Sequence, residues 1–278
     1  MLLTHCRFQL FGVGGVQSDS EGTNIQPTTE RRKLRRSFIG LGLICVLLAT
    51  VPASAGPPYV TDDPVPTDYR HFEIYLFSGG THVRGDTSGA SGIDFNYGAG
   101  PDLQLSATLP FAYDRPSGGS TATGIGNIEL AAKYRFIHQE RRGWDVAFFP
   151  RVFLPAGSGK VGERHASLFL PIWVGKDWGK WSTFGGGGCT INRGGGSQDF
   201  CMASWALTRQ VLPDLQLGAE IVHQTPDTRD GRATTGVGAG LKYDVNENYH
   251  LLAYAGPGLQ NAAETNQYSW YASILLTF

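Results

Sequence analysis

The sequence predicts an all-β fold, a transmembrane antiparallel up-and-down β-barrel of about twelve strands over residues 70–278. Three observations lead to this fold class. The chain ends on an aromatic residue, Phe278, after a segment from Tyr268 in which apolar and polar side chains alternate. Similar alternating segments precede it, and each gives a strand one apolar face for lipid and one polar face for a lumen. Short and long connections alternate between the segments, which is typical of short periplasmic turns and long external loops.

Composition agrees with many short strands. The 278 residues include 38 Gly, 15 Phe, 11 Tyr and 6 Trp, and the formal net charge is −1. No apolar run of about 18 residues occurs beyond the amino-terminal region, which disfavours a helical membrane protein. The near-zero charge argues against a nucleic-acid partner. No zinc, calcium or phosphate-loop motif occurs, so we expect no cofactor and no metal site.

Residues 1–55 are expected to be an amino-terminal extension followed by a signal peptide. A basic stretch at 31–36 precedes an apolar run at 38–51, and Ala53-Ser54-Ala55 supplies small residues for cleavage after Ala55. A short membrane anchor is the alternative for the same segment. Export then places the mature chain in the bacterial outer membrane. Residues 56–69 are proline-rich, so we expect an extended periplasmic lead-in without regular secondary structure.

The strands can be justified in chain order by their alternation. The clearest is 127–136, where Leu130 and Tyr134 share one face while Glu129, Lys133 and Arg135 share the other. Alternation predicts the whole set near 70–76, 93–97, 102–109, 127–136, 144–152, 166–174, 180–188, 199–209, 214–223, 234–244, 248–256 and 267–278. The long connections are expected at 78–92, 110–126, 155–165, 189–198, 224–233 and 257–266. Tight turns lie between the other pairs, for example at 100–101 and 212–213.

The last strand indicates two partners. A terminal Phe278 after alternating apolar residues is similar to the signal that the outer-membrane assembly machinery binds, and its apolar face requires outer-membrane lipid. Aromatic residues near strand ends are typical of interface girdles; they are Tyr97, Tyr113, Tyr134, Trp144, Trp178, Trp181, Tyr243 and Tyr249.

Two cysteines remain after cleavage of the signal, Cys189 and Cys201. They flank a glycine-rich stretch in a protein that enters an oxidising compartment. A disulfide that closes a hairpin loop is the preferred interpretation, and two free thiols are the alternative.

Strand parity assigns a mixed set of charges to the lumen, and these residues are the candidate lumen-lining site. The charges either pair as structural ion pairs or line a narrow water path. Our hypothesis is that they form the constriction, with Arg135 and Arg151 as the residues to neutralise in a test. The set is Glu73, Asp94, Glu129, Lys133, Arg135, Asp145, Arg151, Glu220 and Lys242. Tyr75, Phe77, Phe149, Phe153 and Trp173 are expected to point inward and narrow the path.

Several segments resemble a known family. They are Pro-Pro-Tyr-Val-Thr-Asp-Asp-Pro at 57–64, Lys-Tyr-Arg-Phe at 133–136, Phe-Gly-Gly-Gly-Gly at 184–188, His-Gln-Thr-Pro-Asp-Thr at 223–228 and Gln260-Asn261. Together they are similar to outer-membrane proteins of the phenol-degradation meta-pathway family, which are distantly similar to barrels that admit fatty acids and aromatic hydrocarbons. The resemblance implies a channel or transporter for passive uptake of a small solute, hydrophobic and aromatic molecules included. It does not extend to the long amino-terminal plug of the hydrocarbon porins.

Two other functions remain as alternatives. His165 and Ser167 share a strand face with Asp177 further along, and this is the residue set of a lipid-modifying outer-membrane hydrolase. Parity turns His165 and Ser167 toward the lumen rather than the lipid, so we expect no enzyme and no catalytic residues. A non-conducting, adhesin-like barrel that binds surface partners through the charged loop 224–233 is the second alternative.

Overall fold

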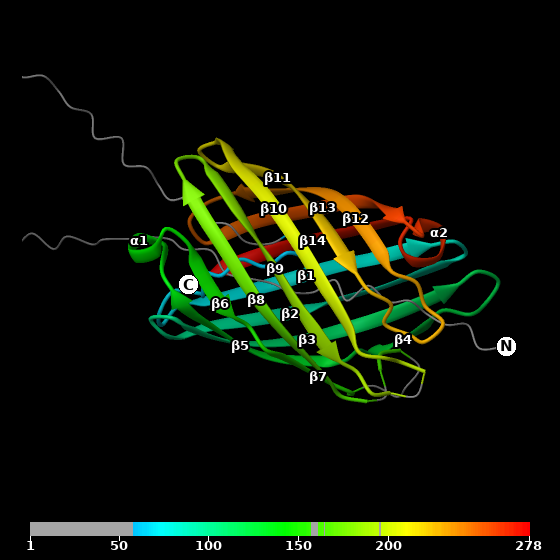
Figure 1. Cartoon of the computed structure of the whole chain (residues 1–278). Helices are drawn as coiled ribbons and strands as arrows, with labels where there is room; N and C mark the ends of the chain where they lie inside the picture. The colour runs from blue at the N-terminus through cyan, green and yellow to red at the C-terminus, as the bar shows by residue number, and fades with distance from the viewer. Residues whose placement is uncertain (1–57, 157–160, 164, 195) are drawn as a thin grey trace, which may run out of the picture.

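The chain forms a closed antiparallel β-barrel. The computed structural model describes residues 58–156, 161–163, 165–194 and 196–278, and in that part the 12-stranded barrel predicted from the sequence is confirmed (Figure 1). The first and last strands pair from Glu73–Thr277 to His82–Tyr268 and so close the sheet. The elements are β1 (Phe72–Val83), β2 (Asp86–Gly100), β3 (Leu103–Pro116), β4 (Ala122–Ile125), β5 (Ile128–Ile137), α1 (Gln139–Arg142), β6 (Asp145–Phe148), β7 (Arg151–Leu154), β8 (Ser167–Trp178), β9 (Trp181–Ile191), β10 (Phe200–Leu212), β11 (Leu215–Gln224), β12 (Thr234–Asp244), β13 (Tyr249–Gln260), α2 (Ala262–Thr265) and β14 (Tyr268–Thr277).

Two strands of the barrel are interrupted, so the 12 barrel strands consist of the 14 segments β1 to β14. β4 and β5 both pair with β3, and they are separated only by Gly126 and Asn127. β6 and β7 both lie between β5 and β8, and they are separated by Phe149 and Pro150. Proline has no N–H to give to a ladder, so a break at Pro150 is expected.

The connection expected at 78–92 is different in the structure. β1 and β2 pair without a gap up to Val83–Asp86, so the predicted long loop is a turn at Arg84 and Gly85. This part of the sheet is rich in Gly, Ser and Thr. Such strands lack the apolar outer face that lipid requires, and the sequence pattern therefore resembles a loop. The longer connections 155–166, 192–199 and 225–233 lie at the same end of the barrel as this turn.

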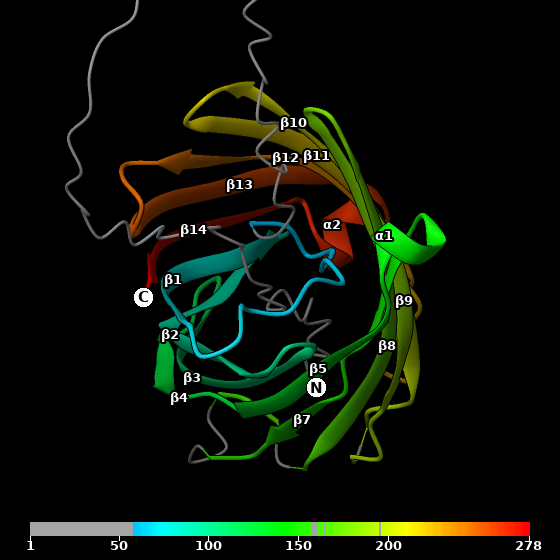
Figure 2. The ribbon, with the colours of Figure 1, turned by 90° about the vertical axis from the view of Figure 1, so that its left-hand side faces the viewer.

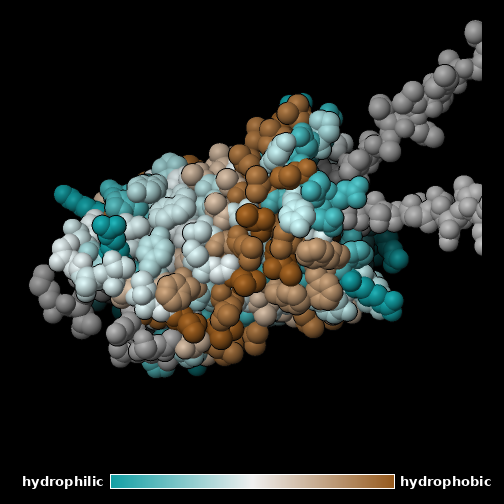
Figure 3. All heavy atoms as spheres, turned by 180° about the vertical axis from the view of Figure 1, so that it is seen from behind, coloured by the Kyte–Doolittle hydropathy of each residue, from teal (hydrophilic) through white to brown (hydrophobic). Residues whose placement is uncertain are grey.

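The outer surface carries the apolar face of the alternating strands. Large apolar side chains are exposed there, and on the face seen in Figure 3 they gather in a band across the barrel, with more polar surface toward one end. Examples are Leu76, Ile93, Leu105, Leu130, Ile172, Leu217, Leu251 and Ile274. Within the described residues, no helix has the length and apolar character needed to cross a membrane.

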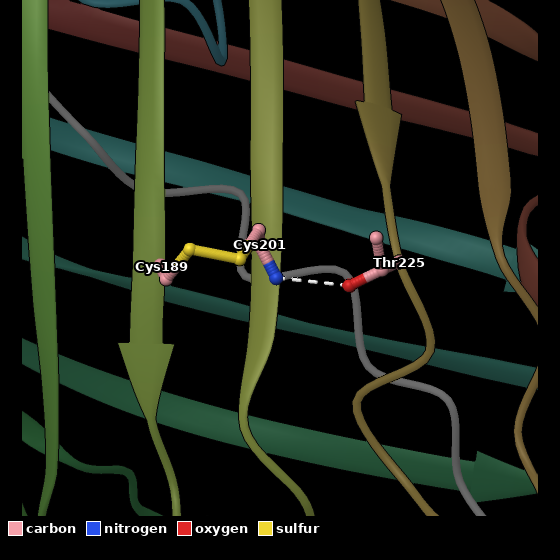
Figure 4. The surroundings of a disulfide bond; sticks show 3 residues. All are labelled: Cys189, Cys201 and Thr225. Carbon is pink, nitrogen blue, oxygen red and sulfur yellow. Dashed lines mark hydrogen bonds between the residues drawn. A yellow bond between two sulfur atoms is a disulfide. The ribbon is translucent and has the colours of Figure 1, made fainter.

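A disulfide joins Cys189 of β9 to Cys201 of β10, and the two residues face each other directly in the ladder (Figure 4). The backbone N–H of Cys201 also donates to the Thr225 hydroxyl at 2.9 Å (Figure 4). The bridge closes the connection between β9 and β10 at the end of the barrel that carries the longer loops.

The largest difference from the sequence-based expectation is the position of the lead-in. We expected residues 56–69 to lie in the periplasm, and the described residues of this segment up to Asp68 instead lie inside the barrel (Figure 2). Tyr59, Thr61, Asp62 and Thr67 are each at most 3% exposed. The segment has no regular secondary structure, as its prolines predict. We call residues 58–68 the lumen segment.

Candidate functional site

The lumen segment is held by a carboxylate on the barrel wall. Glu220, which points inward from β11, accepts hydrogen bonds from the backbone N–H of Val60 at 3.0 Å and of Thr61 at 2.9 Å. The Thr61 hydroxyl donates to the same carboxylate at 2.6 Å. Charge-assisted bonds of this kind are about twice as strong as neutral ones. One buried wall residue therefore satisfies three donors of a segment that has no ladder of its own.

A second anchor is an ion cluster around Asp62. Lys133 of β5 donates to Asp62 Oδ1 at 2.9 Å, and Arg151 of β7 donates to Asp62 Oδ2. Glu129 lies 3.7 Å from the Arg151 guanidinium. The side chains of Lys133 and Asp62 are fully buried and that of Arg151 is 4% exposed, so water screens these charges little. The lumen segment thus supplies a carboxylate that pairs with two wall cations, and Glu129 provides the second negative charge of the cluster.

Aromatic rings support both cations. The Lys133 ammonium lies 4.8 Å and the Arg151 guanidinium 4.3 Å from the ring centre of Phe149. A second ring, that of Phe169, lies 6.0 Å from the Arg151 guanidinium. These distances are in the range of cation–π attraction, which is strongest where water is excluded.

Inward-facing glycines make room for the lumen segment. A Cβ added at Gly98 would come within 1.8 Å of the Asp68 carbonyl oxygen, and one at Gly240 within 2.8 Å of the Tyr59 ring. The Tyr59 hydroxyl donates to the Gly240 carbonyl at 3.1 Å, and its ring packs edge-on against Phe184 and Tyr254. Only glycine permits such close approach of a second chain to the wall.

Beyond the lumen segment the barrel contains a cavity of about 190 Å³, toward the longer loops. Val60 lines it from the lumen segment, and Phe77, Phe169 and Trp173 are buried aromatic residues of its wall. Asn192 and Asp227 line it from the connections at the loop end. The lumen therefore consists of an occupied middle and an aromatic chamber beside the loops.

The charges assigned to the lumen by parity do face inward, but they do not form one constriction. All except Arg135 are buried, and the Arg135 side chain is 17% exposed. Arg135 binds Asp102 at 3.3 Å and Asp145 at 3.4 Å near the short turns. Arg151 pairs with Ala131 in the ladder, four residues from Arg135 along β5, which is about 13 Å. A single role for Arg135 and Arg151 is therefore not supported by their positions.

The remaining inward charges form small separate groups. Glu73 accepts a hydrogen bond from the Tyr75 hydroxyl at 3.2 Å, and Asp94 accepts one from Thr108. Lys242 lies 3.3 Å from Asp244 at the short-turn end. These contacts stiffen the wall around the lumen segment.

The hydrolase residues do not converge. Ser167 begins β8 and Asp177 lies near its end, so ten residues, or about 33 Å of strand, separate them. An acid at that distance cannot orient His165, which lies just before Ser167. In the described part of the chain, no group of three or more His, Cys, Asp or Glu side chains is placed to hold a metal ion.

Asp62 and Gln104 are site residues that the predicted set of lumen charges did not include, although strand parity places Gln104 on the polar face of its strand. Asp62 lies outside every strand, and Gln104, which accepts hydrogen bonds from the Thr67 N–H and hydroxyl at 2.8 and 3.1 Å, is uncharged. The available signal was the alternation of glycines with wall residues at 236, 238 and 240, because inward glycines mark close approach of another backbone.

Comparisons with known proteins agree with this architecture. A family described as "Putative MetA-pathway of phenol degradation" matches residues 58–275. The COG4313 outer membrane channel from Pseudomonas putida F1 has a similar structure, with a TM-score of 0.64 and 17% identity over 80% of this chain and 99% of that chain. The KdgM porin, solved in complex with disordered oligogalacturonate, has a TM-score of 0.51 and 11% identity over 74% of this chain and 99% of that chain. At these identities the likeness establishes a shared fold. No curated protein sequence matches the chain.

Proposed function

Because the chain belongs to the family described as "Putative MetA-pathway of phenol degradation", we propose that it is an outer-membrane channel for passive uptake of small solutes, hydrophobic and aromatic molecules included. One observation carries the proposal. The closed barrel has an apolar outer band and holds, beside its lumen segment, an aromatic chamber of about 190 Å³. A barrel filled only by wall side chains would leave no such chamber.

The lumen segment is the barrier that a solute must pass in this proposal. It is held by hydrogen bonds and ion pairs to five strands, β3, β5, β7, β11 and β12. The bridge between Tyr69 and Gly98 comes just after the segment, and residues 58–68 form no ladder with the wall. Contacts of this kind are broken and remade without opening the barrel. We therefore expect passage to require displacement of residues 58–68, while the strands keep their pairing.

The test is single-channel conductance of the refolded mature chain, residues 56–278, in a planar bilayer. We expect small or infrequent current steps from this chain and larger steps after deletion of residues 56–68. Blockade of the current by an added aromatic solute supports uptake of that solute. A heat-modifiable barrel that never conducts, with or without the deletion, contradicts the proposal and favours the adhesin-like alternative.

A further inference from the structure

The chamber beside the loops is large enough for one aromatic ring. An engineered protein cavity of about 150 Å³ holds one benzene molecule, so about 190 Å³ accommodates one ring with a short substituent. Six aromatic residues line it, namely Phe77, Tyr113, Phe153, Phe169, Trp173 and Phe200. Volume and lining together fit a single-ring solute.

The inner end of the chamber, next to the lumen segment, carries a buried hydrogen-bond donor. Trp173 of β8 is 1% exposed, and its indole N–H has no acceptor among the described residues. Trp173 belongs to an apolar cluster with Phe149 and Phe169, and Met202 packs against both this cluster and the one that contains Val60 of the lumen segment. An indole N–H can only donate, and a buried donor without an acceptor costs free energy until a ligand supplies one. The inner end therefore matches a ring that carries a hydrogen-bond acceptor.

Two oxygens without a partner among the described residues lie at the other end of the chamber. They are Asn192 Oδ1 and the Thr228 hydroxyl, and both residues belong to connections at the loop end. Trp173 pairs with Gly186 in the ladder, and Asn192 comes six positions after Gly186, which is about 20 Å of strand. A ring with one short substituent is much shorter than this. A solute seated beside Trp173 therefore meets the indole donor and not these oxygens.

The chamber offers no unpaired cation for an anionic solute. Arg151 is the one cation among the described lining residues, and it binds Asp62 and lies 3.7 Å from Glu129. A carboxylate that leaves water for an aromatic enclosure loses its hydration, and this loss is costly unless a new partner replaces the water. An uncharged acceptor is therefore favoured over an ionised one.

Among uncharged acceptors, a carbonyl oxygen fits best. It has only lone pairs, so it satisfies the indole N–H without adding a donor of its own that would stay unpaired among apolar side chains. We propose that the inner end of the chamber binds uncharged single-ring carbonyl compounds, aryl ketones and aldehydes, whose oxygen accepts the Trp173 N–H. This inference rests on the proposed channel function and names a class of solute for it.

Two compounds of the same shape separate the hydrogen bond from burial of the ring. Acetophenone and 2-phenylpropene differ only in the oxygen that replaces a methylene group. Their affinities are measured by isothermal titration calorimetry on the mature barrel in nonionic detergent, with empty micelles as the blank, in the parent chain and in Trp173→Phe. We expect the substitution to weaken acetophenone binding about fivefold more than 2-phenylpropene binding, which is the effect of about one hydrogen bond. An equal change for both compounds overturns the proposal.

Trp205→Phe is the matched control. Trp205 is 42% exposed on the outer face of β10, and its N–H already donates to the Thr183 hydroxyl at 2.8 Å. Neither affinity should change in this variant. Loss of acetophenone affinity here, with none in Trp173→Phe, places the ligand on the outer surface and overturns the proposal.

Benzoate tests the preference for an uncharged solute. It resembles acetophenone in size but carries a carboxylate, so we expect it to bind the parent chain at least about tenfold more weakly. Equal or tighter binding of benzoate contradicts the proposal.

The indole N–H signals of the ¹⁵N-labelled parent chain give a measurement that does not depend on the folding of a variant. The chain contains six Trp, so six indole signals are expected. A new hydrogen bond moves its proton downfield, so acetophenone should shift one of these signals downfield and 2-phenylpropene should not. Absence of this shift at saturating acetophenone overturns the proposal.

Conductance is measured separately on the same chain, because the binding site and the channel can fail independently. A barrel that conducts but does not distinguish the two compounds refutes only the carbonyl site. A barrel that binds acetophenone through Trp173 but never conducts refutes only the channel.

Discussion

Replacement of Asp62 by Asn should release the lumen segment while the barrel stays folded. The substitution keeps the shape of the side chain, but it removes the charge that faces Lys133 at 2.9 Å and also faces Arg151. Both cations remain buried, and Glu129 stays 3.7 Å from Arg151. Breaking a buried ion pair costs about 3–5 kcal/mol because the remaining charge is uncompensated. The substitution therefore destabilises the bound position of residues 58–68 by about this amount relative to the released position.

Release of the lumen segment can be measured as the accessibility of one of its residues to a thiol reagent. A cost of about 3–5 kcal/mol corresponds to a roughly 150- to 5,000-fold change in the equilibrium between bound and released segment. Pro66 is buried in the lumen segment, and Cys189 and Cys201 are bonded to each other, so Pro66→Cys introduces the single free thiol of residues 56–278. We expect a maleimide to label this thiol at least about a hundredfold faster when Asn replaces Asp62.

Asp63→Asn is the matched control. Asp63 is also fully buried, but it accepts a 2.7 Å hydrogen bond from the Val65 N–H through an oxygen that Asn retains. Labelling should change little in this variant. Equal labelling rates in Asp62→Asn and in the parent chain refute the reasoning, and so does a loss of heat-modifiable barrel in Asp62→Asn alone.

The remaining predictions concern the other contacts of the lumen. Gly240→Ala places a Cβ within 2.8 Å of Tyr59 and should speed the same labelling, whereas Gly236→Ala, on the same face with its nearest neighbour at 3.5 Å, should not. Arg151→Gln leaves Glu129 without its cation, so the reversal potential of the current should shift toward greater cation selectivity, and an unchanged potential argues against a lumen role. Cys189→Ser with Cys201→Ser opens a bridge between residues 12 positions apart, which should lower stability in urea by about 3 kcal/mol, and an unshifted midpoint contradicts the entropic estimate.

Alternation of side chains was sufficient to predict the barrel and the inward direction of its charges. Lipid outside and a polar lumen inside impose a period of two on every strand, and Glu129, Lys133 and Glu220 follow it. The pairing partner of Lys133 could not be predicted in this way. Asp62 lies in a segment with no period, and its distance of 71 positions from Lys133 gives no local signal.

The sequence of the lumen segment resembles that of a solvated linker, although the segment is buried. Residues 58–68 are rich in Pro, Asp and Thr, a composition typical of water-exposed linkers. Inside a barrel such residues can be buried because the wall supplies the polar partners that water would otherwise supply. Glu220 receives the donors of Val60 and Thr61, and Lys133 neutralises Asp62. A polar segment that precedes a barrel with inward cations, carboxylates and glycines is therefore better interpreted as a candidate occupant of the lumen than as a solvated tail. The segment pairs with the wall charges and fills the space that the glycines leave.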